Sequence, residues 1–135
     1  MVEAINRTKA KIDLKLVENV AEKFLQVYKI KNREVSIAFV SDSEIKKINK
    51  QYRHLDKATD VLSFAGEDNF LGEIIIDFAQ IKRQAKEFDK KVKDELIIIL
   101  VHGLLHLAGY DDKTEKERLE MIGLGEKFIK KVSKL

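Results

Sequence analysis

Two histidines lie four residues apart in the most apolar segment of the chain, which reads Leu96-Ile-Ile-Ile-Leu-Val-His-Gly-Leu-Leu-His-Leu-Ala-Gly109. In an α-helix, residues i and i+4 lie on one face about one turn apart, so His102 and His106 can direct their imidazoles at one point. Imidazole nitrogen is a common metal ligand in proteins. The spacing therefore favours a metal site. The alternative is a pair of core histidines that are hydrogen-bonded to backbone or carboxylate groups.

The residues that follow the pair supply a third candidate ligand. Gly109 is placed to end the helix in a left-handed conformation, so that the chain reverses and brings Asp112 back towards the histidine face. The pattern His-x-x-x-His-x-x-Gly-x-x-Asp then offers two nitrogens and one oxygen. Three protein ligands and one open position are typical of a catalytic zinc site. The alternative for Asp112 is a helix N-cap, a role that Asp111 or Thr114 can fill equally well.

This spacing is similar to that of the metzincin peptidases, whose pattern is His-Glu-x-x-His-x-x-Gly-x-x-His. Their glutamate is the general base of peptide hydrolysis. The corresponding position here is Gly103. We therefore expect a metzincin-like metal helix that serves a different reaction.

The composition predicts one globular domain spanning residues 1–135, with 44% hydrophobic and 36% charged residues. The absence of cysteine excludes disulfides and thiol nucleophiles, and it fits a reducing cytoplasm. No signal peptide is expected, and the longest apolar run is too short to span a bilayer. We therefore expect a soluble cytoplasmic protein without a membrane partner. The net charge of +3 slightly favours binding to anionic partners.

Hydrophobic periodicity and capping signals predict an α+β fold: a mixed sheet of about four strands packed against about five helices. Asp13 is a predicted N-cap, and Ser41-Asp-Ser-Glu44 is a predicted capping box. The strands are expected at 2–6, 34–40, 61–64 and 71–77. The helices are expected from Asp13 to about Tyr28, from Ser41 to about Arg53, and over about 79–88, 92–107 and 114–132.

A second dense stretch runs Asn49-Lys-Gln-Tyr-Arg-His-Leu-Asp-Lys-Ala-Thr-Asp-Val-Leu-Ser-Phe64. It is followed by Leu71-Gly-Glu-Ile-Ile-Ile76 and then by the histidine motif, whose core is His-Gly-Leu-Leu-His-Leu-Ala-Gly-Tyr-Asp. In this order and spacing, the three stretches resemble the YbeY family of bacterial rRNA maturation factors. The resemblance, with the chain length and the flanking helices, covers essentially the whole chain.

The resemblance implies a metal-dependent, single-strand-specific endoribonuclease that acts in maturation of the 3′ end of 16S rRNA and in ribosome quality control. Single-stranded RNA, 16S rRNA and the ribosome are thus the expected partners. The family's zinc ligands correspond to His102, His106 and position 112, and its functional arginine corresponds to Arg53. Where the family has a third histidine, this chain has Asp112. A carboxylate is an acceptable zinc ligand, but it lowers the net charge of the site and makes Mn²⁺ or another hard divalent ion a more suitable occupant.

Two other functions are compatible with the same residues. One is a non-enzymatic ribosome-assembly factor in which the metal ion only stabilises the fold. The other is a hydrolase of a different ester or amide, because the ligand pattern alone does not specify the substrate.

Overall fold

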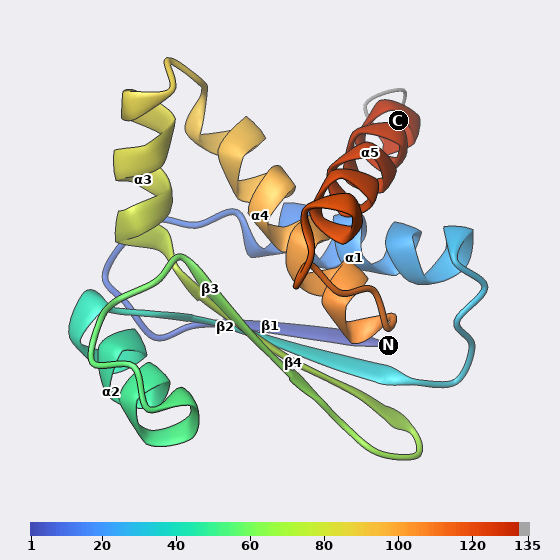
Figure 1. Ribbon diagram of the computed structural model, residues 1–135, viewed down its shortest axis with the longest axis horizontal. Coiled ribbons are helices and arrows are strands. Elements are labelled where there is room, and N and C mark those ends of the chain that lie inside the picture. Colours follow the sequence, from blue (N-terminus) through green and yellow to red (C-terminus); the bar gives the residue numbers. More distant parts are fainter. Residues whose placement is uncertain (133–135) are drawn as a thin grey trace.

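The computed structural model describes residues 1–132 of the chain. Within this range the chain forms four strands and five helices (Figure 1). In chain order they are β1 (Val2–Asn6), α1 (Leu14–Val27), β2 (Glu34–Val40), α2 (Asp42–Arg53), β3 (Val61–Ala65), β4 (Phe70–Asp77), α3 (Phe78–Glu87), α4 (Val92–Leu107) and α5 (Glu115–Val132). The predicted α+β architecture and its order of elements are confirmed.

The four described strands form one mixed sheet in the order β1-β2-β4-β3. β1, β2 and β4 are parallel, whereas β3 runs antiparallel to β4 and is an edge strand. The chain therefore crosses over twice, through α1 and through α2 with β3, to keep the central strands parallel. The outer edge of β3 is left free of strand partners within residues 1–132, and this edge borders the site described below.

The two faces of the sheet carry unequal cover (Figure 1). The larger hydrophobic core lies between one face and α1, α3, α4 and α5. On the opposite face, α2 packs Ile45 against Val40, Leu62 and Ile75. Because side chains alternate along a strand, β3 contributes Leu62 to the α2 side and directs Ser63 to the α4 side. One short strand thus connects the two layers.

The helix that carries both histidines is the most deeply packed of the described helices, as predicted. Eight of the 16 residues of α4 are buried, against five of 14 in α1. Although α4 is apolar, no helix in residues 1–132 combines the length and the hydropathy needed to cross a membrane. A buried helix is a rigid platform, so it fixes the positions of the side chains that reach the surface at its C-terminal end.

Candidate metal centre

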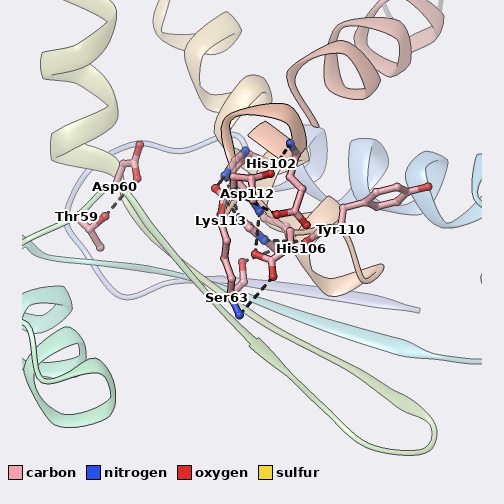
Figure 2. A network of polar contacts seen from close by, with 12 residues as sticks. Thr59, Asp60, Ser63, His102, His106, Tyr110, Asp112 and Lys113 are labelled. Atoms are coloured by element: carbon pink, nitrogen blue, oxygen red, sulfur yellow. Dashed lines mark hydrogen bonds and ion pairs between the residues drawn. The ribbon is translucent and has the colours of Figure 1, made fainter. Parts of the chain in front are cut away.

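The side chains of His102, His106 and Asp112 converge on one point (Figure 2). The two Nε2 atoms are 3.1 Å apart, and each lies 3.4 Å from Asp112 Oδ2. Ligand atoms about 2.1 Å from a tetrahedral ion are separated by about 3.4 Å from one another. The three atoms are therefore spaced as three corners of a tetrahedral coordination shell, and two nitrogens with one carboxylate oxygen fit Zn²⁺ or Mn²⁺.

The hydrogen bond of His106 determines which of its nitrogens faces the other two groups. Its Nδ1 lies 3.1 Å from the backbone oxygen of Tyr110. A carbonyl oxygen can only accept, so Nδ1 carries the proton and donates it. In the neutral ring, Nε2 then presents a lone pair towards His102 and Asp112. This is the orientation that a metal ligand requires, with the second nitrogen held by a backbone carbonyl.

The environment of His102 also favours the form that binds metals. Burial lowers the pKa of His102, and the neighbouring His106 imidazole lowers it further, against the opposing effect of the Asp112 carboxylate. A lowered pKa keeps the ring neutral at a pH where an exposed histidine starts to be protonated. Only the neutral ring has a lone pair for a metal ion.

The chain reversal after α4 brings Asp112 to the histidines. Gly109 has a φ of 104°, a conformation that suits glycine. The Tyr110 N–H donates to Leu105 O and the Gly109 N–H donates to His106 O, which together form a Schellman motif. Asp111 Oδ1 accepts the N–H of Asp112 at 2.8 Å and so holds the backbone of the turn. The predicted left-handed stop at Gly109 is confirmed.

Asp112 is not the N-cap of the last helix. Thr114 Oγ1 accepts the Glu117 N–H, and Glu117 Oε1 accepts the Thr114 N–H, each at 3.1 Å. This reciprocal capping box satisfies the start of α5 without any contribution from residue 112. Of the two alternatives for Asp112, the structure therefore supports the one in which its carboxylate faces the histidines.

The three side chains line an open cleft of about 830 Å³ between α4, its following loop and the β3 edge. Arg53, at the end of α2, lines the same cleft. The structure thus brings all four predicted site residues to one place. The remaining lining residues are Thr59, Asp60, Val61, Ser63, Ala65, Ile98, Ile99, Leu107, Gly109, Tyr110, Asp111 and Lys113.

Two local features hold the end of α2 beside the cleft. His54 takes a left-handed conformation, with φ of 60°, and ends the helix directly after Arg53. Buried Asn49 donates from Nδ2 to Lys57 O at 2.9 Å and so fastens the following loop to the helix. The Arg53 guanidinium then reaches Ser63 O on the edge strand at 3.5 Å and remains exposed. An exposed arginine with free N–H groups is available to bind an anion bidentately.

Gly103 stands where the peptidase pattern has its glutamate, and it lies in a closely packed position. A Cβ at position 103 would lie 3.1 Å from Ile74 Cγ2 and 3.2 Å from Ser63 Oγ. The Ser63 hydroxyl donates to the Gly103 carbonyl at 3.4 Å, so helix and edge strand are in close contact here. A side chain at this position would require Ile74 or Ser63 to shift by a few tenths of an ångström. Because residue 103 is a glycine, the site lacks the general base of that peptidase class.

The sequence alone did not predict that several other residues line the cleft. Asp60 and Ser63 lie in the Thr59–Phe64 run, but nothing in that run indicates which side chains face α4. Asp60 Oδ2 accepts from Gln84 Nε2 at 3.3 Å, a contact between residues 24 positions apart. Lys113, next to the third candidate ligand, was also missed. A lysine following two aspartates is an ordinary surface pattern, so only the folded loop shows its position.

The fold and the site define a small α+β protein with an open candidate metal centre of two histidines and one carboxylate. Comparison with known families is consistent with this class. The family described as Endoribonuclease YbeY matches residues 3–133. The chain belongs to this family, as the resemblance in its motifs predicted.

Relatives and solved structures show the same relationship. An Endoribonuclease YbeY from Persephonella marina is 39% identical over 129 residues, covering 90% of this chain and 84% of the relative. One from Thermotoga maritima is 38% identical over 122 residues, covering 87% and 81%. A solution structure of a Thermotoga maritima protein superposes with a TM-score of 0.71 at 34% identity, covering 98% of this chain and 89% of the other.

Proposed function

We propose that this protein is a metal-dependent endoribonuclease that cleaves single-stranded RNA, with the 3′ end of 16S rRNA as its substrate during ribosome maturation. The observation that carries the proposal is the convergence of two imidazole Nε2 atoms and one carboxylate oxygen within 3.1–3.4 Å in an open cleft. The relatives of this chain bear the name Endoribonuclease YbeY, which supports the reaction class. The ribosome is the proposed partner and the cytoplasm the proposed location.

His102, His106 and Asp112 would hold the ion. A divalent ion in such a site supplies Lewis acidity to a phosphoryl oxygen and acidifies water. Zn²⁺ is the proposed occupant, with Mn²⁺ as an alternative because Asp112 replaces a neutral imidazole by an anion. The tautomer of His106 is held by Tyr110 O, so its Nε2 lone pair needs no reorganisation on binding.

Arg53 is the proposed catalytic side chain. Phosphodiester cleavage develops negative charge on the equatorial oxygens, and a guanidinium can donate two parallel hydrogen bonds to them. The position of Arg53 on the wall of the same cleft supports this role. Because it is presented by a separate helix, its geometry does not depend on the loop that carries Asp112.

Chelation combined with an assay on single-stranded RNA tests the proposal. A catalytic ion predicts that a chelator abolishes cleavage and that Zn²⁺ or Mn²⁺ restores it, while the melting temperature changes little. A non-enzymatic assembly factor with a structural ion predicts no cleavage and a large fall in melting temperature. A double-stranded RNA of the same sequence is the control for strand specificity, and a phosphate monoester and a peptide ester test for other hydrolase activities.

A further inference from the structure

We propose that Lys113 is a second phosphate-binding residue of the cleft, in addition to Arg53, and is needed because residue 112 is an acid. The inference rests on the proposed function, since it assigns a role to Lys113 in binding an RNA backbone. Lys113 lies next to the candidate ligand Asp112 in the chain and lines the same cleft.

The net charge of the cleft depends on Lys113. Among the described residues that line it, two are permanent cations, Arg53 and Lys113, and three are carboxylates, Asp60, Asp111 and Asp112. With neutral histidines the cleft thus has a formal net charge of −1 before an ion binds, and +1 with a divalent ion. If Lys113 were neutral, the loaded cleft would have no net charge. Lys113 therefore decides whether the loaded cleft attracts a phosphodiester.

Lys113 is also placed where it can contact a bound RNA strand. It follows Asp112 directly in the loop between α4 and α5 and lines the same cleft as the histidines and Ser63 (Figure 2). Arg53 lines the cleft from a different element, the end of α2 beside the β3 edge. Two cations from separate elements, with the candidate metal ligands in the same cleft, can contact different phosphates of a single strand.

The Lys113 side chain is exposed and only weakly paired. Its side chain is 83% exposed, and its ion pair is with Asp111 at 3.7 Å. An exposed pair of this kind contributes little to stability, so a phosphate can replace the Asp111 carboxylate at little cost. Asp111 keeps its other function after the exchange, because its Oδ1 still accepts the Asp112 N–H.

The test compares Lys113→Gln with Lys116→Gln, which removes the same charge from an exposed position three residues later that does not line the cleft. Binding of a short labelled single-stranded oligoribonucleotide is measured by fluorescence anisotropy with the Zn²⁺-loaded protein, at a temperature and time at which the oligoribonucleotide stays intact, over a series of salt concentrations. The kinetic constants kcat and KM are measured separately with the metal-loaded protein.

We expect Lys113→Gln to weaken binding about three- to tenfold and to reduce the slope of log K against log salt by about 0.7, the value for one phosphate contact on a single strand. KM should rise by a similar factor with kcat nearly unchanged. Lys113→Arg should restore binding, and Lys116→Gln should behave as the parent protein. Equal behaviour of the Lys113→Gln and Lys116→Gln proteins, or a parent protein that does not bind the RNA, overturns the inference.

The two proposals fail in different ways. A parent protein that binds the oligoribonucleotide through Lys113 but never cleaves it contradicts the proposed function and supports the binding role. A parent protein that cleaves RNA with a KM unaffected by Lys113→Gln supports the proposed function and removes Lys113 from substrate binding.

Discussion

Two clusters of polar side chains differ in how their charges are balanced. In the first, Arg83 donates two hydrogen bonds to Asp42, at 2.7 and 3.2 Å, and buried Asp77 lies close by. In the second, the candidate metal centre, Asp112 faces two imidazoles, which are cations only when protonated. The first cluster therefore contains its own permanent cation, and the second does not.

The pKa values show the same difference. The hydrogen bonds from Arg83 lower the pKa of Asp42 to about 2, which is the effect of a partner that stabilises the anion. At the metal centre, burial lowers the pKa of His102 and so disfavours the protonated ring that would serve as the partner of Asp112. A cluster that contains its cation is suited to joining elements of the fold, here α2 to α3. A cluster without one is suited to accepting an ion from solution.

The largest expected effect is on the metal centre. His106→Ala removes one of three candidate ligands, and we expect RNA cleavage to fall by about 10³-fold or more, the upper end of the effect of a single electrostatic group. The free energy of unfolding should change by about 1 kcal/mol, the value of one hydrogen bond. Single-turnover cleavage and urea denaturation measure the two quantities. A His106→Ala protein that retains cleavage would show that the triad is only structural.

Arg53→Ala should have the next largest effect. Because the guanidinium is exposed and its bond to Ser63 O is long, at 3.5 Å, the fold should tolerate its loss. Turnover should decrease by about 10²–10³-fold, as for other donors to developing charge. Arg33→Ala is the matched control, since Arg33 is an arginine that lies outside the cleft and bonds Asp68 O. Parental turnover in the Arg53→Ala protein would exclude Arg53 from the mechanism.

The convergence of the candidate metal ligands was more predictable than the cluster of Asp42, Asp77 and Arg83 because its determinants are local. The i, i+4 spacing of His102 and His106 follows from helix geometry alone. Predicting the position of Asp112 required one further inference, namely that Gly109 takes a left-handed conformation and reverses the chain. These determinants lie within one helix and its following loop.

The contacts that the sequence did not predict depend on packing between residues far apart in the chain. Ser63 contacts Gly103 across 40 residues, and Arg83 contacts Asp42 across 41. Neither contact can be predicted from the neighbouring residues in the sequence. Predicting them requires knowledge of which edge of the sheet α4 and α3 border. The family resemblance supplied Arg53 for this reason. No family motif pointed to Lys113, because its proposed role arises from the departure at residue 112.

The pH dependence of stability should separate the two clusters. Burial, and then the adjacent Asp42, raise the pKa of Asp77 from 3.8 to about 7. Folded Asp77 thus retains a proton that the unfolded chain has lost, so its contribution to stability is complete below pH 3.8 and is lost as the pH rises to about 7.

Asp77→Asn should flatten this part of the profile. The amide cannot titrate, and its Oδ1 can still accept the Gln80 N–H as the N-cap of α3. Urea denaturation at a series of pH values would show a smaller loss of unfolding free energy between pH 4 and 7 than in the parent protein. RNA cleavage at a fixed pH should be unchanged. An identical pH profile in both proteins would mean that Asp77 is ionised in the fold.

The smallest expected effect comes from removing the cation of the first cluster. Arg83→Gln breaks the bidentate pair with Asp42 and the bonds to Gln80 Oε1. Since the pair is about half exposed, the loss at neutral pH should be about 1 kcal/mol. The lowered pKa of Asp42 stabilises the fold above pH 3.8 and ceases to do so as the pH falls to about 2, so the difference from the parent should shrink over that window.

Arg118→Gln, at an exposed position of α5, is the control for a change of charge without a change in this cluster. Cleavage should be parental in both variants, because neither side chain lines the cleft. If Arg83→Gln instead reduced turnover, the contact between α2 and α3 would be needed to hold Arg53 beside the cleft. The two clusters would then be coupled through α2, which carries Asp42 at its first residue and Arg53 at its last.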